Sequence, residues 1–122
     1  MILVFHRSYF CAPCRQQLSE LKKIYPLVKE GGGEILVLSA EERELSARLK
    51  REESLPFPLL VDDGRAGRAF GVHDLLGDGL DAPAVFVIDG QGVIRWKQVG
   101  RHFADLASPQ RVKNVFRKVV GR

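Results

Sequence analysis

Both cysteines of the chain lie in the segment Phe10-Cys11-Ala12-Pro13-Cys14-Arg15, three residues apart, at the point where an apolar run gives way to a helical pattern. Two thiols at this spacing can close on each other. A disulfide across so small a loop restricts the unfolded chain very little, because the stabilisation from a cross-link grows with the length of the loop that it closes. The pair therefore predicts redox chemistry rather than a structural cross-link.

The segments around the cysteines alternate between strand and helix patterns. Residues 2–6 form an apolar run without alternation, which is typical of a central strand covered on both faces. Residues 12–30 carry apolar positions on one helical stripe, and residues 34–38 match a second buried strand. The apolar positions of the stripe are Leu18, Leu21, Tyr25 and Val28. Ser39, with Glu42 three residues later, matches a capping box and predicts that a second helix starts there.

The rest of the chain continues this pattern with shorter elements. Residues 55–61 are apolar but hold two prolines, so they can be extended only at a sheet edge or as a connector. A short helix is expected over residues 65–70. Asp-Gly between the apolar runs 84–88 and 93–99 indicates an antiparallel hairpin, and the Ser-Pro pair at 108–109 predicts the start of a last helix.

Composition is that of a single globular domain. The chain has 122 residues, 45% of them apolar, which is enough to bury one core, so we expect one domain over residues 1–122. The net charge is +4, but the aromatic residues are not interleaved with the basic ones, so we expect no nucleic-acid partner. The opening apolar run is too short for a signal peptide or a membrane span, so we expect a soluble cytoplasmic protein with no membrane partner.

The positions of the two thiols give them different expected roles. A strand that ends just before a helix places Cys11 at the helix N-terminus, where unpaired N–H groups and the helix dipole favour a thiolate. Arg7 and Arg15 add positive charge if they turn toward it. Pro13 costs no hydrogen bond in the first turn and stiffens the loop between the thiols. We therefore expect Cys11 to be the nucleophile and the more shielded Cys14 to be the resolving thiol.

Two other uses of a CxxC pair compete with this interpretation. A zinc site needs more ligands, but the chain has no second CxxC and no pair of histidines at metal-binding spacing. Two inert buried thiols are the other alternative, but a helix start beside arginines is a poor setting for them. We expect no metal and no other cofactor.

Six segments carry a family resemblance. They are residues 3–7, 10–15, 55–62, 69–72, 83–89 and 92–95. Together they resemble the thioredoxin superfamily, and more closely its peroxiredoxin-like branch, the alkyl hydroperoxide reductase and thiol-specific antioxidant (AhpC/TSA) group. The resemblance implies a thioredoxin-like three-layer α/β/α sandwich with a mixed sheet of four to five strands. Relatives usually begin with an extra N-terminal segment, so we expect a near-minimal version whose uncovered surface is open to a partner or a second copy.

The resemblance also implies a substrate-binding surface. In this superfamily the proline before the third core strand is cis and faces the cysteines, and Pro83, preceded by Ala82, stands at the matching position. We expect Pro83, Ala82 and the Phe10 side chain to contact the substrate. An ordinary trans Pro83 and a Phe10 packed against the sheet are the alternatives.

Two departures from the superfamily leave the proton-transfer group open. Thioredoxins have a buried Asp six residues before the first cysteine, where this chain has Phe5. Cytochrome-maturation relatives have an acid three residues after the second cysteine, where this chain has Gln17. His6, Glu41 and Glu42 are the remaining candidates for the general base, although each suits a surface or capping role.

The peroxidase pattern of the branch is incomplete in this chain. Ser8 fits the hydroxyl position three residues before the cysteine. Val4 and Pro83, however, stand where peroxiredoxins have a proline and a peroxide-polarising arginine. Arg7 is the candidate that could replace the missing charge.

These features favour a thiol-disulfide oxidoreductase that acts in redox homeostasis. Its partners would be a protein or small-molecule disulfide and a thiol electron donor. Two alternatives stay open: a thiol peroxidase that reduces hydroperoxides through Cys11, and a non-catalytic binding module that senses redox state. We expect the chain to be a monomer or a homodimer.

Overall fold

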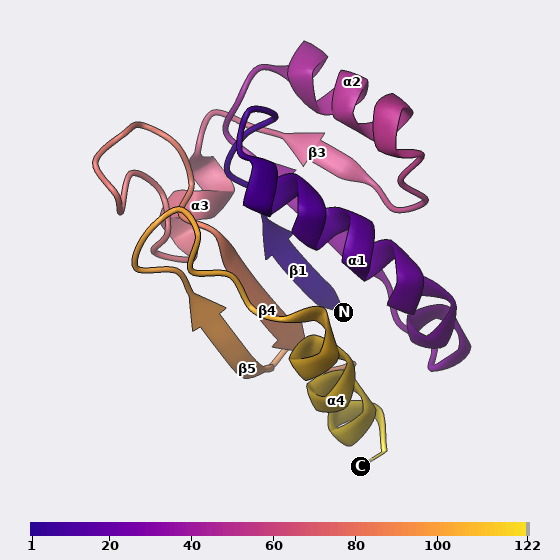
Figure 1. Cartoon of the computed structure of the whole chain (residues 1–122). Coiled ribbons are helices and arrows are strands. Elements are labelled where there is room, and N and C mark those ends of the chain that lie inside the picture. Colours follow the sequence, from indigo (N-terminus) through magenta and orange to yellow (C-terminus); the bar gives the residue numbers. More distant parts are fainter. Residues whose placement is uncertain (122) are drawn as a thin grey trace.

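Five strands form one mixed sheet in the order β3-β2-β1-β4-β5 in the computed structural model, which describes residues 1–121 (Figure 1). The strands are β1 (Ile2–Phe5), β2 (Ile35–Ser39), β3 (Leu59–Val61), β4 (Ala84–Ile88) and β5 (Ile94–Val99). The helices are α1 (Ala12–Glu30), α2 (Arg43–Glu53), α3 (Arg65–Ala69) and α4 (Pro109–Val120). Within the described residues, no helix is long and apolar enough to cross a membrane.

The strand β1 lies at the centre of the sheet and is buried on both faces. It runs parallel to β2 and antiparallel to β4, so Ile2 pairs with both Ile35 and Val87. All four residues of β1 are buried, as the unbroken apolar run predicts. The carboxyl end of β1 therefore leads the chain directly from the core into the loop before α1.

Three helices cover one face of the sheet, and α3 covers the other. The two parallel crossovers, from β1 to β2 and from β2 to β3, step in the same direction, so their right-handed connections place α1 and α2 on one face. The helix α4 packs there too, and the core on this face includes Leu21 and Phe116. On the other face Phe5 and Phe86 pack against Phe70, which directly follows α3. The sandwich therefore has the predicted layers, but its third layer is reduced to the five residues of α3 and the adjoining loops.

The edge position of β3 confirms what the two prolines before it predict. Pro56 and Pro58 precede the strand, where their missing N–H groups remove no hydrogen bond from the ladder. The Pro58 carbonyl still accepts a hydrogen bond from the Val37 N–H at 3.0 Å. The segment therefore contributes only three residues to the sheet, along its outer edge.

The capping box predicted at the start of α2 is wrong. Ser39 is the last residue of β2 and pairs with Val61, so its backbone belongs to the sheet. Its hydroxyl accepts a hydrogen bond from the Glu41 N–H at 3.2 Å. The helix begins at Arg43, with Glu42 as an N-cap that makes no side-chain cap bond. The strand β2 thus ends at residue 39, one residue later than the local pattern predicts.

The C-terminal hairpin and helix form as the sequence predicts. The strands β4 and β5 pair antiparallel across residues 89–93. Ser108 is the N-cap of α4, and its hydroxyl accepts a hydrogen bond from the Arg111 N–H at 3.2 Å. Pro109 occupies the first turn, where its missing N–H has no helical partner to lose.

Candidate active site

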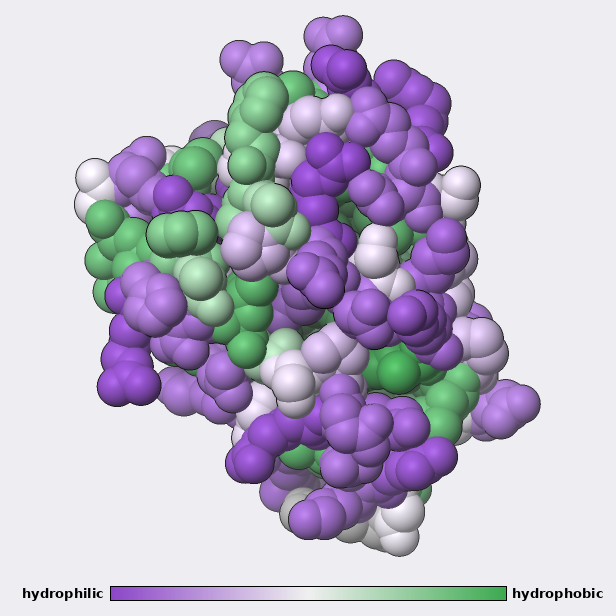
Figure 2. Space-filling model, viewed as in Figure 1, coloured by the Kyte–Doolittle hydropathy of each residue, from purple (hydrophilic) through white to green (hydrophobic). Residues whose placement is uncertain are grey.

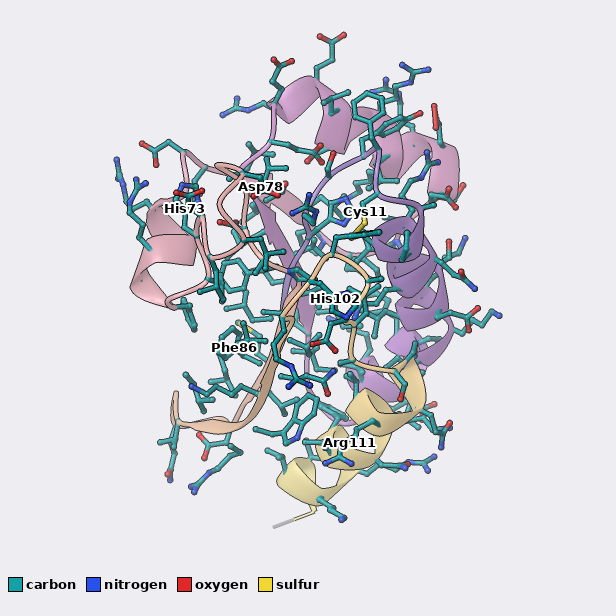
Figure 3. The ribbon with its side chains drawn as sticks, turned by 60° about the vertical axis from the view of Figure 1, so that its left-hand side comes forward. Cys11, His73, Asp78, Phe86, His102 and Arg111 are labelled. Atoms are coloured by element: carbon teal, nitrogen blue, oxygen red, sulfur yellow. A yellow bond between two sulfur atoms is a disulfide. The ribbon has the colours of Figure 1, made fainter. Side chains whose placement is uncertain are left out.

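The two cysteines form a disulfide at the N-terminal end of α1 (Figure 3). Their Cα atoms lie 5.3 Å apart. Cys11 is 9% exposed, whereas Cys14 is 1% exposed and its Sγ lies 4.0 Å from the Phe103 carbonyl oxygen. A reagent from solvent therefore reaches Cys11 before Cys14.

Cys11 is the N-cap of α1. Its backbone is extended, and its Sγ accepts a hydrogen bond from the Cys14 N–H at 3.4 Å. Pro13 stands in the first turn, where a missing N–H costs nothing. The unpaired N–H groups and the dipole of this 19-residue helix favour negative charge on the Cys11 sulfur once the disulfide is reduced.

A tight turn carries the chain from β1 to Cys11. The Phe10 N–H donates to the Ser8 hydroxyl oxygen, and the Cys11 N–H donates to the Ser8 carbonyl oxygen, each at 3.1 Å. The hydroxyl and the carbonyl of Ser8 therefore both accept hydrogen bonds within the turn. Ser8, predicted as an auxiliary site residue, fixes the backbone directly in front of the first cysteine.

The buried carboxylate of Glu41, which follows β2, holds the same turn. Its Oε2 accepts a hydrogen bond from the Tyr9 N–H at 2.8 Å, and its Oε1 accepts one from the Ser46 hydroxyl at 3.3 Å. Burial raises the pKa of Glu41, although these two hydrogen bonds act in the opposite direction. One carboxylate thus links the active-site turn to α2.

His6 lies beside this carboxylate in the interior. Its Nε2 is 3.8 Å from Glu41 Oε1 and has no hydrogen-bond partner among the described residues. Burial, together with the nearby charge of Arg15, lowers the pKa of His6 from 6.5 to about 4, against a hydrogen bond to the Ser8 backbone that raises it. The imidazole is therefore neutral at pH 7.

The structure separates the three candidates for a general base. His6 and Glu41 are buried next to each other, whereas Glu42 is exposed at the start of α2. A surface or capping role for His6 and Glu41 is therefore wrong. Because β1 and β2 are adjacent and parallel, the residues that follow the two strands meet at the same end of the sheet.

The two positions at which relatives carry an acid have other roles in this chain. Phe5 is fully buried and packs edge-on against Phe86. Gln17 is also buried, and its amide donates a hydrogen bond to the Ala107 carbonyl oxygen at 3.0 Å. Gln17 thereby ties α1 to the segment that precedes α4.

The two arginines near the thiols are both engaged by carboxylates. Arg15 pairs with Glu53 at 2.7 Å and with Glu52 at 3.3 Å, at the end of α2. Arg7 pairs with Asp78 on the loop between α3 and β4. Acidic partners thus compensate the positive charge of both arginines, and a direct effect of either one on the thiols stays a prediction.

A groove with a volume of about 530 Å³ lies beside Cys11. Its lining residues are Arg7, Ser8, Phe10, Cys11, Ala12, Pro13, Leu80 and Phe103. Phe10 is 77% exposed and Phe103 is 53% exposed, and Figure 2 shows apolar surface gathered at this end of α1. Phe10 is therefore a surface residue, and its alternative role as part of the core is wrong. In the part of the chain that the structure describes, no group of potential metal ligands converges.

Pro83 differs from what the family resemblance implies. No peptide bond within residues 1–121 is cis, so the bond before Pro83 is trans. Both Pro83 and Ala82 are buried. The Pro83 carbonyl accepts a hydrogen bond from the Gly100 N–H at 2.7 Å, and the Ala82 N–H donates one to the Val72 carbonyl at 2.9 Å. The expectation of a cis Pro83 is therefore wrong, and Pro83 is an ordinary trans proline that directly precedes β4, with its carbonyl bound by the Gly100 N–H.

Two residues of the groove, Leu80 and Phe103, are not indicated by the sequence pattern. Leu80 belongs to the loop before β4, and Phe103 to the loop after β5, and neither stands in a recognisable motif. The sequence marks this surface only by a large aromatic residue, Phe103, in a largely polar segment. Their approach to Cys11 depends on tertiary folding rather than on local pattern.

The fold and the site together define a class of protein. A mixed sheet of this order, with a CxxC disulfide at the N-terminus of the helix after its central strand, is the arrangement of thioredoxin-like proteins with a redox-active cysteine pair. The chain belongs to the AhpC/TSA family, whose sequence profile matches residues 1–97. It is thus a thiol-based protein of that family.

Curated relatives of similar sequence are thiol-disulfide oxidoreductases. The chain is 29% identical over 92 residues to the thiol-disulfide oxidoreductase ResA of Bacillus cereus, covering 75% of this chain and 50% of the relative. It is 28% identical over 110 residues to ResA of Halalkalibacterium halodurans, covering 83% of this chain and 58% of the relative. The chain therefore spans between 50% and 58% of the length of these two relatives.

Solved structures with the same fold include peroxiredoxins. A peroxiredoxin-like protein from Aquifex aeolicus superimposes with a TM-score of 0.83 at 18% identity, covering 97% of this chain and 70% of that one. AhpC from Mycobacterium tuberculosis superimposes with a TM-score of 0.81 at 20% identity, covering 94% of this chain and 66% of that one. These similarities confirm the thioredoxin-like α/β fold.

The buried His6 predicts a specific loss of stability in acid. Its pKa is lowered from 6.5 to about 4 in the folded protein, so the unfolded chain binds the proton more readily between these values. The contribution of the neutral His6 side chain to the free energy of unfolding is present above pH 6.5. It is lost as the pH falls from 6.5 toward 4. The free energy of unfolding of the wild type should fall relative to that of His6→Asn by about 3 kcal/mol between pH 7 and pH 4.

Urea unfolding of both proteins across this pH range measures the difference directly. Contributions from groups other than His6 are common to both proteins and cancel, apart from the adjacent Glu41, whose raised pKa acts in the opposite direction. A gap between the two proteins that is independent of pH would contradict a buried neutral imidazole.

The carboxylate of Glu41 predicts different effects for two substitutions. Glu41→Gln keeps an oxygen that can accept the Tyr9 N–H, whereas Glu41→Ala leaves this N–H and the Ser46 hydroxyl without an acceptor. We expect Glu41→Ala to lose about 2 kcal/mol more than Glu41→Gln, the usual cost of leaving buried polar groups unsatisfied. Urea unfolding measures the loss, and amide exchange at Tyr9 locates it. Equal losses in the two variants would show that the hydrogen bonds do not hold the turn.

Proposed function

We propose that this protein is a thiol-disulfide oxidoreductase in redox homeostasis, with Cys11 as the nucleophile and Cys14 as the resolving thiol. The observation that carries the proposal is the unequal access to the two sulfurs of one disulfide at a helix N-terminus. Cys11 opens on a groove, whereas Cys14 lies beneath it against the Phe103 carbonyl. The named activity of the ResA relatives supports the same function.

In the reducing direction the reaction consists of two thiol–disulfide exchanges. The Cys11 thiolate attacks one sulfur of the substrate disulfide, that S–S bond breaks, and the departing thiolate takes up a proton. Cys14 then loses its proton and attacks the Cys11 sulfur of the mixed disulfide, which releases the second substrate thiol. Two electrons and two protons have passed to the substrate, and the Cys11–Cys14 disulfide has formed. An external thiol donor returns it to the dithiol by the reverse exchanges.

The groove suits a disulfide flanked by apolar groups. Phe10 and Phe103 are exposed residues that line it, and Leu80 adds a third apolar side chain. An aromatic rim of this kind buries apolar surface of a partner without requiring a particular sequence. We propose that a protein or small-molecule disulfide binds there. Contact of the buried Pro83 and Ala82 with substrate stays a prediction.

A thiol peroxidase is the second candidate, because the family and the matching folds include peroxiredoxins. In that reaction the Cys11 thiolate takes one oxygen from a hydroperoxide and releases an alcohol, and Cys14 condenses with the sulfenic acid to release water. The charges at the site favour a peroxidase less than a disulfide oxidoreductase. Pro83 occupies the position at which the family resemblance implies a peroxide-polarising arginine, and Arg7 is paired with Asp78. We therefore rank disulfide exchange first.

Several other expectations stay predictions from the sequence. They concern the cytoplasmic location, the thiol electron donor, the monomeric or dimeric state and the absence of nucleic-acid and membrane partners. A non-catalytic redox sensor would use the same cysteine pair without turnover. Only activity measurements separate it from an enzyme.

Two single-cysteine variants test the assigned roles. The reduced wild type should reduce insulin disulfides with dithiothreitol as the electron donor, and Cys11→Ser should reduce them only at the uncatalysed rate. After reduction and removal of dithiothreitol, Cys14→Ser should accumulate a mixed disulfide with the substrate, because no thiol remains to resolve it. Non-reducing electrophoresis and intact mass measure the adduct, with Cys11→Ser as its matched control.

Hydrogen peroxide supplies the second arm of the same experiment. Rapid peroxide consumption that disappears in Cys11→Ser, with no insulin reduction, would replace the proposal by the peroxidase. Inertness toward both substrates would leave the redox sensor. Adducts that form with Cys11→Ser instead of Cys14→Ser would reverse the two roles.

A further inference from the structure

Arg7 is the only charged side chain among the eight residues that line the groove beside Cys11. It follows β1 by two residues and precedes the active-site turn, so its backbone belongs to the same segment as Cys11. A cation close to a thiol favours the thiolate and makes that sulfur a better leaving group. Arg7 alone would therefore bias the cysteine pair toward the reduced, ionised form.

The charge of Arg7 is compensated by a residue from a distant part of the chain. Asp78 pairs with it across 71 positions in sequence, and the two side chains are only 20% and 30% exposed. Partial removal from water strengthens such a pair relative to one on the open surface. In the view of Figure 3, Asp78 lies between His73 and Cys11.

The loop that carries Asp78 is built to hold it in place. Its ends are joined by the His73–Asp81 contact at 3.0 Å and by a hydrogen bond from the Asp74 N–H to the Leu80 carbonyl at 2.8 Å. The Leu80 N–H donates to Asp78 Oδ1 at 3.1 Å, so the carboxylate is fixed from its own loop as well as by Arg7. Partial burial acts to raise the pKa of Asp78, but the Leu80 N–H and Arg7 outweigh it and hold this pKa below its usual value. Asp78 is thus ionised at neutral pH.

We propose that Asp78 is a positioning residue that sets the reactivity of Cys11 by neutralising Arg7. The inference deepens the proposed thiol-disulfide function and rests on it for its biological meaning. With the ion pair intact, Arg7 stabilises the Cys11 thiolate less, and the dithiol is therefore a stronger reductant. With the pair broken, Arg7 stabilises the thiolate, and the couple becomes more oxidising.

Arg15, Glu41 and His102 have partners other than Asp78. Arg15 is paired with Glu52 and Glu53 on α2, and Glu41 is held by the Tyr9 N–H. His102 lies on the loop after β5, where its ring accepts a hydrogen bond from the Ala104 N–H. A change at Asp78 therefore acts on Cys11 through Arg7 or through its own lost charge, and these two routes can be separated.

The substitution Asp78→Asn removes the charge and keeps the oxygen that accepts the Leu80 N–H. In the Cys14→Ser background Cys11 is the only thiol, so the pH dependence of iodoacetamide alkylation reports its ionisation directly. We expect Asp78→Asn to lower the midpoint of that dependence by about half a unit or more. Asp63→Asn is the matched control. It also removes one carboxylate charge, but from an exposed residue just before α3 that pairs with Arg68, so the midpoint should be unchanged.

The protein with both cysteines gives a second readout. Its disulfide and two glutathione molecules are in equilibrium with the dithiol and one glutathione disulfide. We expect Asp78→Asn to shift this equilibrium toward the dithiol by about threefold or more.

A second substitution, Arg7→Gln, decides the route. The shift caused by Asp78→Asn should vanish when Arg7 is already Gln. An unchanged midpoint in Asp78→Asn, or an equal shift with and without Arg7, would overturn the inference. Neither readout requires insulin reduction, so failure of the proposed function and failure of this inference are distinguishable.

Discussion

The structure of the site depends on where α1 begins. Because β1 is central and buried on both faces, its carboxyl end fixes the point at which the chain leaves the core. A single tight turn then brings Cys11 to the N-cap of α1, and Cys14 follows one helical turn later. Helix geometry therefore gives the two sulfurs unequal environments: one opens on the groove and the other is enclosed. The order of attack and resolution that we propose rests on this inequality.

A second constraint is the buried acid next to the turn. The family resemblance implies an acid on the strand before the cysteines or in the helix after them, and here Phe5 and Gln17 occupy those positions. The buried carboxylate comes instead from Glu41, after the neighbouring strand β2, and it accepts the Tyr9 N–H. His6 lies beside it as a neutral imidazole. In this chain, the buried titratable pair at this end of the sheet is therefore formed by the residues that follow β1 and β2.

Local pattern predicts much of this fold because much of it is decided locally. The unbroken apolar run of β1, the stripe of α1 and the Ser108 cap act over a few residues, and all three appear in the structure. The features that the sequence did not predict depend on distant contacts. Ser39 pairs with Val61 of β3 and therefore cannot serve as the predicted N-cap of α2. The Arg7–Asp78 pair joins residues 71 positions apart in sequence. The same holds for Phe103, which reaches the cysteines only through the return of the loop after β5.

The central claim is that Cys11, and not Cys14, is the reacting sulfur. Brief treatment of the reduced wild type with a limiting amount of iodoacetamide at neutral pH tests it most directly. Trypsin releases both cysteines in one peptide, residues 8–15, and its fragment masses show which sulfur carries the label. We predict that the label is found on Cys11 in the folded protein and on both cysteines after unfolding in urea. Preferential labelling of Cys14 in the folded protein would contradict the account.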